Sequence, residues 1–146
     1  MSTRLALRIL ERPDADDPFL PRIRLLLWVS FLTWDGTFSL PELAIIDTGA
    51  PLSLIPHDVW QGIRYLKVRN DVIQGIVPHS ECDLDVIDGV INCVLQDDLG
   101  RSSEVVTIRA HLAPTDDVPL LLGFGGLLDQ ANLYFSLPQS QAYLEI

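Results

Sequence analysis

The chain has 146 residues, 48% of them hydrophobic, which is enough for one domain with its own apolar core. Its 20 acidic and 10 basic side chains give a formal charge of -10, which argues against a nucleic-acid-binding protein because phosphates attract basic patches. Two cysteines, Cys82 and Cys93, are too few for a disulfide framework, so reduced thiols are expected.

The sequence does not predict a membrane protein. Its N-terminal residues lack the apolar segment of a signal peptide, and the apolar run at 25–32 is too short to span a bilayer. We therefore expect a cytoplasmic protein with no membrane span.

The first half of the chain predicts strands and one short helical turn. Residues 5–10 form a first strand and residues 23–33 a long second one, followed by Asp35-Gly36, which supplies the positive φ of a hairpin turn. The run 43–46 is apolar on both faces, so it predicts a buried strand. Pro56 favours a short helical turn through Trp60, because its fixed φ suits a first helical position.

The second half of the chain predicts further short strands. Apolar or alternating runs occur at 72–77, 82–86, 90–95, 104–112 and 144–146. Turns are predicted at Asp88-Gly89 and from Asp97 to Gly100, and a short C-terminal helix at 127–133. We therefore expect an all-β fold, a closed small β-barrel, in a single domain over 1–146; the N-terminal segment 1–21 has no predicted role.

The most informative segment is the end of the buried run 43–46, where Asp47 is followed by Thr48, Gly49 and Ala50. Burial and a nearby second carboxylate raise the proton affinity of an Asp enough to make an acid/base pair of unequal partners. The chain offers a single Asp in this setting, so a second copy would have to supply the other carboxylate. The alternative is an Asp that caps a turn by accepting backbone N–H bonds.

Two segments together resemble the retropepsin-like aspartic proteases. Residues 47–50, with the apolar residues on both sides, resemble the active-site loop of that family. Later in the chain Leu121, Leu122 and Gly123 resemble its apolar-apolar-Gly motif. The order and spacing of the two motifs carry the resemblance, which covers about 22–135 in a chain too short for the two lobes of a pepsin.

The resemblance implies an aspartic endopeptidase that acts as a homodimer on an extended peptide or protein substrate. Two Asp47 carboxylates would share one proton and activate a water, with no metal and no cofactor. Thr48 would hydrogen-bond a main-chain carbonyl of the opposing subunit, and Gly49 and Ala50 would leave room beside the carboxylates. A hairpin flap would close the cleft, and its tip is assigned to Gly75, Ile76 and Val77.

The sequence departs from the retroviral pattern at two positions. Pro51 stands where those enzymes usually have Asp or Ser, and Phe124 where they have Arg. Substrate specificity is therefore not carried over from the viral relatives. Two other functions stay open: a catalytically inactive dimerisation or peptide-binding module with the same fold, and a β-barrel ligand binder in which Asp47 only caps a turn.

A zinc site is disfavoured, because the available His and Cys residues lack paired spacing. These residues are His79, Cys82, Cys93 and His111.

Overall fold

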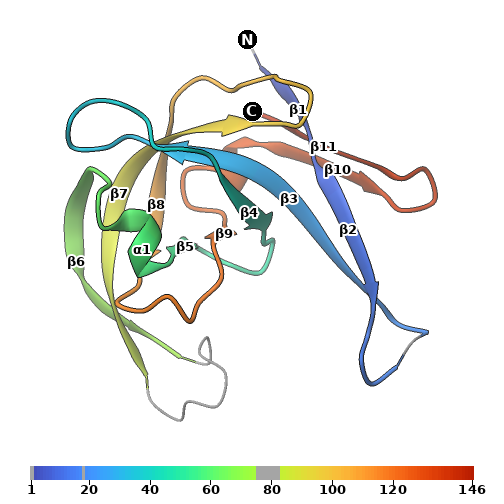
Figure 1. Cartoon of the computed structure of the whole chain (residues 1–146), viewed down its shortest axis with the longest axis horizontal. Helices are drawn as coiled ribbons and strands as arrows, with labels where there is room; N and C mark the ends of the chain where they lie inside the picture. Colours follow the sequence, from blue (N-terminus) through green and yellow to red (C-terminus); the bar gives the residue numbers. More distant parts are fainter. Residues whose placement is uncertain (1, 18, 75–82) are drawn as a thin grey trace.

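The computed structural model describes residues 2–17, 19–74 and 83–146, which form two β-sheets (Figure 1). The larger sheet has eight strands in the order β2-β3-β4-β9-β5-β8-β7-β6, and the smaller has three in the order β1-β11-β10. The strands are β1 (Arg4–Ala6), β2 (Arg8–Pro13), β3 (Pro21–Phe31), β4 (Glu42–Ile46), β5 (Ser53–Ile55), β6 (Tyr65–Ile73), β7 (Leu84–Gln96), β8 (Val106–Leu112), β9 (Leu121–Leu122), β10 (Asn132–Ser136) and β11 (Gln141–Glu145). The all-β prediction is confirmed.

The apolar core consists mainly of side chains of the large sheet, joined by a few of the small sheet, and follows the period-2 pattern of the strands. Side chains alternate between buried and half-buried along most of β7, and Ile91 lies opposite Ile108 of β8 in the ladder. Phe31 and Leu95 belong to the same buried cluster, and Leu5 and Leu144 of the small sheet join it. Each large apolar side chain buried in this way contributes roughly 1.5–3 kcal/mol.

Several local predictions are confirmed. The turn after β3 contains Gly36 at φ +89°, and the turn after β7 contains Gly100 at φ +84°. The predicted helical turn is α1 (His57–Trp60), which Pro56 precedes. The buried strand before Asp47 is β4. These features depend on contacts within a few residues, which local sequence determines.

The turn predicted at Asp88-Gly89 is wrong, because β7 continues through both residues. The Asp88 side chain is fully buried, and Arg109 donates to its two carboxylate oxygens at 2.7 and 3.0 Å. A Cβ at Gly89 would lie 3.5 Å from the Leu66 carbonyl oxygen, an ordinary contact, so the packing of the strands does not require glycine at this position. A polar dipeptide typical of turns is thus retained in a strand by an ion pair from the next strand.

The helix predicted at 127–133 is also wrong. A 3-10 turn covers only Leu128–Gln130, and β10 follows, paired in antiparallel register with β11 from Asn132↔Glu145 to Ser136↔Gln141. Leu133, Tyr134 and Phe135 favour a strand because such side chains pack well on a pleated surface. Pairing with β11 therefore outweighs the short helical pattern.

The N-terminal segment belongs to both sheets. Leu7 separates β1 from β2, and its N–H donates to the Ala142 carbonyl at 3.0 Å. β1 pairs with β11 of the same chain, and β2 pairs with β3 in a long hairpin (Figure 1). In the part of the chain that is described, no helix has the length and apolarity needed to cross a membrane.

Candidate active site

The structure brings the two motifs together by placing β9 between β4 and β5. β9 runs parallel to β4, with Ile45↔Leu121 and Ile46↔Leu122 in register, and antiparallel to β5 at Leu54↔Leu121. The segment Leu121-Leu122-Gly123 therefore lies beside the loop that begins at Asp47. Two pieces that are distant in sequence form one structural unit.

Gly123 is required by the close approach of the two segments. A Cβ at this position would lie 2.5 Å from the Ala50 carbonyl oxygen and 2.8 Å from that of Leu52, closer than real Cβ contacts. The Gly123 N–H donates to Ser53 Oγ at 3.0 Å, and the Phe124 N–H to the Ala50 carbonyl at 3.0 Å. The loop after Asp47 is thus held to the second motif mainly through backbone atoms.

Asp47 stands at the end of β4, where its N–H donates to the Leu122 carbonyl at 2.9 Å. Its side chain is half-buried, and Oδ1 accepts a hydrogen bond of 2.8 Å from the Gly49 N–H. This bond orients the carboxylate, and it is also the bond that a turn-capping Asp would make. Thr48 and Gly49 are exposed on the same loop, and Ala50 is half-buried.

Asp47 opens onto a cavity of about 330 Å³. Apolar side chains line most of it, with a few polar groups, which is the composition expected of a ligand site. The lining residues are Asp47, Gly49, Ala50, Pro51, Leu52, Leu54, Ile73, Gln74, His111 and Leu121. Six of these are missing from the sequence-based site. Pro51, Leu52 and Leu54 follow the Asp47 loop directly, whereas Ile73, Gln74 and His111 come from β6, the residue after it and β8, which are distant in the chain.

His111 is the most notable of the residues that sequence reasoning did not assign to this site. It lines the cavity from β8, and its Nε2 lies 3.6 Å from Asp71 Oδ2 on β6. Asp71 is also 3.7 Å from Arg69, and Arg69 is 3.3 Å from the buried Asp88. A chain of polar side chains across three strands therefore reaches the cavity wall at His111, and the spacing in sequence carries no signal for it.

Asp88 anchors this network as a carboxylate. Burial raises its pKa, but the hydrogen bonds from Arg109 and the charges of Arg109, Arg69 and His111 lower it more, so that the net pKa lies below the ordinary value. Asp88 is therefore ionised at neutral pH. Its role is structural, since it faces the strands beside the cavity and does not line it.

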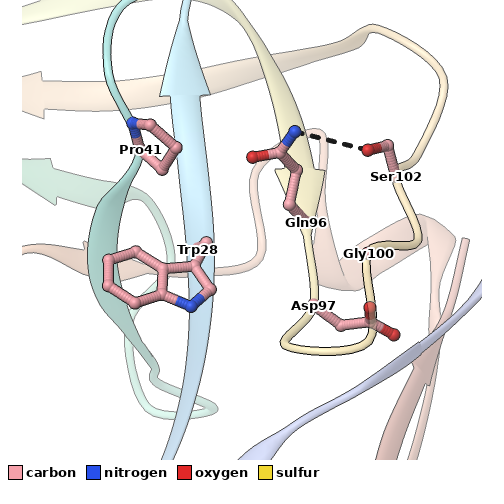
Figure 2. A pocket seen from close by; sticks show the side chains of 6 residues that line it. All are labelled: Trp28, Pro41, Gln96, Asp97, Gly100 and Ser102. Atoms are coloured by element: carbon pink, nitrogen blue, oxygen red, sulfur yellow. Dashed lines mark hydrogen bonds between the residues drawn. The ribbon is translucent and has the colours of Figure 1, made fainter.

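A second hollow, of about 370 Å³, lies around Trp28 (Figure 2), and its lining residues do not include Asp47. Its Gln96 donates to Ser102 Oγ at 3.3 Å. Its one carboxylate, Asp97, accepts bonds from three backbone N–H groups, including that of Ala6, and from Arg101 Nε at 2.7 Å. These bonds hold the pKa of Asp97 below its usual value despite burial. A carboxylate so fully bonded serves the fold, so this hollow lacks a free acid or base.

Among the described residues, one group has metal-ligand spacing: His57, Asp58 and Asp116, whose ligand atoms lie within 4.8 Å of one another. Asp116 Oδ1 accepts from the Asp58 N–H at 2.7 Å, so this carboxylate caps α1. A hydrogen bond with Asp116 raises the pKa of Asp58. Capping accounts for the arrangement without a cation.

Two sets of predicted residues fall wholly or partly outside the described residues. Gly75, Ile76 and Val77 of the predicted flap lie there, as do His79 and Cys82 of the disfavoured zinc set. Cys93 is fully buried, and burial raises its pKa to about 12, which disfavours the thiolate that zinc would need.

Fold and site together define an all-β protein with a half-buried Asp, at the end of a strand, opening onto an apolar cavity. Comparisons of the chain with known protein families, with characterised proteins and with solved structures find no match.

Proposed function

We propose that this chain is a retropepsin-like aspartic endopeptidase that works as a homodimer. The observation that carries the proposal is the insertion of Leu121-Leu122-Gly123 between the two strands that flank the Asp47 loop. The sequence resemblance consists of these same two motifs. Their contact in the fold supplies a physical reason for both motifs to occur in one chain. Asp47 also opens onto a cavity large enough for a substrate side chain.

The proposed mechanism uses one Asp47 from each subunit. Two carboxylates that share a proton hold a water between them; the ionised one removes a proton from the water as it attacks the scissile carbonyl carbon. The neutral one protonates the carbonyl oxygen, which gives a tetrahedral gem-diol. This species collapses as a carboxyl proton passes to the amide nitrogen and a hydroxyl proton returns to the other carboxylate, so the amine leaves without a covalent enzyme intermediate. The bond from the Gly49 N–H would keep each carboxylate oriented for this step.

Other features support the fold and the dimer that this mechanism needs. β3 and β7 lie near opposite ends of the eight-strand order, yet they pair with each other from Trp28↔Gln96 to Phe31↔Cys93. A sheet that pairs back on itself in this way supports a closed barrel. Thr48 is exposed beside Asp47, as a residue that bonds a second subunit would be. Peptide in extended conformation would lie in the apolar cavity, with Gly75, Ile76 and Val77 proposed as the flap.

The test is the isosteric variant Asp47→Asn, compared with Asp117→Asn, an exposed Asp outside the cavity. Labelled casein, an unfolded protein, serves as the substrate over a pH series from acid to neutral. Loss of the acid/base pair should lower the cleavage rate by about 10² to 10⁴-fold, and the control should cleave like the wild type. An Asp47→Asn dimer that cleaves at the wild-type rate refutes the proposal.

Pro51, which stands where the retroviral enzymes usually have Asp or Ser, favours a second candidate, a catalytically inactive dimerisation or peptide-binding module. A statine-containing peptide, which mimics the transition state, separates the two. It should raise the melting temperature of an active dimer and leave that of an inactive module unchanged.

A further inference from the structure

Three arginines face one small hollow on the hairpin that β2 and β3 form. The hollow, of about 140 Å³, is lined by Leu10, Arg12, Arg22 and Arg24. All three arginines are exposed, and Leu10 is half-buried between them and the rest of the sheet. The end of this hairpin projects away from the rest of the chain (Figure 1). The hollow is therefore open to solvent and lined mainly by positive charge.

The pairing of the two strands brings the arginines together. Arg12 lies opposite Arg22 in the antiparallel register, and Leu10 lies opposite Arg24. Opposite residues share a face of a sheet, as do residues two apart along a strand, so all four side chains stand on one face. Like charges that lie directly opposite each other destabilise a strand pair. The Arg12 and Arg22 pair therefore has an energetic cost, which a bound anion would remove.

Within the described residues, a carboxylate compensates only one of the three charges. Arg22 Nε lies 2.9 Å from Asp14 Oδ2. Hydrogen bonds from the Asp16 N–H and from Arg22 lower the pKa of Asp14, so this carboxylate is ionised at neutral pH. No carboxylate oxygen in the described part of the chain lies within 4.0 Å of a guanidinium nitrogen of Arg12 or Arg24. Two positive charges at the hollow are thus left uncompensated.

Acidic residues near this hairpin do not line the hollow. Glu11 stands on the opposite face of β2 from the arginines. Asp47 directly follows the last β3–β4 pair, Leu25↔Ile46, and yet lies more than 4.0 Å from the Arg24 guanidinium. The chain has 20 acidic side chains against 10 basic ones, so uncompensated arginines on one face are an exception in it. The hollow is a positively charged site on a strongly acidic protein.

From these observations we infer that the hollow binds the phosphate group of a small soluble phosphate monoester. Three guanidinium charges less the one carboxylate, that of Asp14, leave a charge of +2 at the hollow. A phosphate monoester carries about −1.5 to −2 at pH 7 and has three acceptor oxygens. A carboxylate carries one charge and has two oxygens, so it matches the site less well. Arginine side chains bind phosphate oxygens through paired N–H groups. This inference does not depend on the proposed function.

Size and total charge narrow the ligand further. The hollow is smaller than the roughly 300 Å³ or more of sites that enclose a drug-sized ligand. It would hold the phosphate group and leave the remainder of the monoester in solvent. A chain with a formal charge of -10 repels extended polyanions such as nucleic acids and anionic membranes. A small soluble molecule is therefore the ligand that the charge distribution favours.

Titration with glycerol 2-phosphate, a small phosphate monoester, tests the inference by nuclear magnetic resonance at constant ionic strength. Saturable shifts should be confined to the β2–β3 hairpin, with a dissociation constant on the order of 1 mM. Arg12→Gln and Arg24→Gln each remove charge-assisted hydrogen bonds and should weaken binding at least about tenfold. The control is Arg64→Gln, the same change of charge at an exposed arginine outside the hollow, which should leave the dissociation constant within about twofold.

Two further ligands test the chemistry and the source of the phosphate. Acetate, a simple carboxylate, should bind at least about tenfold more weakly than glycerol 2-phosphate. Phosphatidylcholine vesicles that contain phosphatidic acid should bind no more protein than pure phosphatidylcholine vesicles do. Equal affinity for acetate, or binding to the phosphatidic acid vesicles alone, overturns the inference. Absence of saturable shifts overturns it as well, and so does full affinity in Arg24→Gln.

Calorimetry gives a second measurement on the same variants. Glycerol 2-phosphate at about ten times its dissociation constant should raise the melting temperature of the wild type and of Arg64→Gln. It should leave the melting temperature of the double variant Arg12→Gln/Arg24→Gln unchanged, and an equal rise in that variant contradicts the inference. Neither measurement involves cleavage, so the result is independent of the Asp47→Asn comparison that decides the protease proposal.

Discussion

Replacing Gly123 by Ala should move the Asp47 loop. The new Cβ would lie 2.5 Å from the Ala50 carbonyl oxygen and 2.8 Å from the carbonyl carbon and oxygen of Leu52. All three are backbone atoms, which cannot rotate away as a side chain does. Restoring ordinary contact needs a displacement of nearly 1 Å between the two segments. The displacement falls on the loop that positions the carboxylate.

The expected cost follows from these contacts. Overpacking costs about 1–3 kcal/mol, and the weakened hydrogen bonds from Gly123 to Ser53 and from Phe124 to Ala50 add roughly 1 kcal/mol more. Unfolding free energy should fall by about 2–4 kcal/mol in total, and the melting temperature by about 5–15 °C at roughly 2–4 °C per kcal/mol for a domain of this size. In an active protease, misplacement by about 1 Å should also lower kcat about 10²-fold.

Gly62→Ala is the matched control, because a Cβ at Gly62 meets nothing within 4 Å. Its unfolding free energy should stay within about 0.5 kcal/mol of wild type. Calorimetry and urea unfolding measure both variants. Equal melting temperatures for Gly123→Ala and Gly62→Ala would show that the two motifs are not in the contact described, and the reasoning would fail.

Two further predictions concern the buried carboxylates. Asp88→Asn keeps the shape of the side chain but removes the charge that Arg109 and Arg69 contact. Because both arginines are partly exposed, the free energy of unfolding measured in urea should fall by only about 2–3 kcal/mol. An unchanged urea midpoint would contradict this prediction. The pKa values of Asp88 and Asp97 are lower in the folded protein than the ordinary 3.8. The ionised carboxylates therefore stabilise the fold fully at pH values above the unfolded pKa. This stabilisation is lost as the pH falls through the folded pKa values. Acid titration of the double variant Asp88→Asn/Asp97→Asn should therefore show a shallower loss of stability below about pH 4 than wild type, and parallel curves would argue against both shifts.

Local sequence accounts for the features that depend on neighbouring residues. The Asp35-Gly36 turn, the buried strand before Asp47 and the short helix after Pro56 were all predictable, because glycine, apolar alternation and proline restrict the backbone directly. The two motifs of the site were also visible, as a carboxylate after an apolar run and a glycine after two leucines. What the sequence alone settled is therefore the all-β class and the position of the one Asp that opens onto the cavity.

Tertiary contacts decided the rest. Asp88-Gly89 is typical of a turn, yet Arg109 on another strand stabilises it within β7, and the expected helix at 127–133 gives way to β10 because β11 supplies its hydrogen bonds. His111 reaches the cavity of Asp47 only because β8 pairs with β5. Such contacts join residues far apart in the chain, and their free energy depends on burial and pairing that no local pattern encodes.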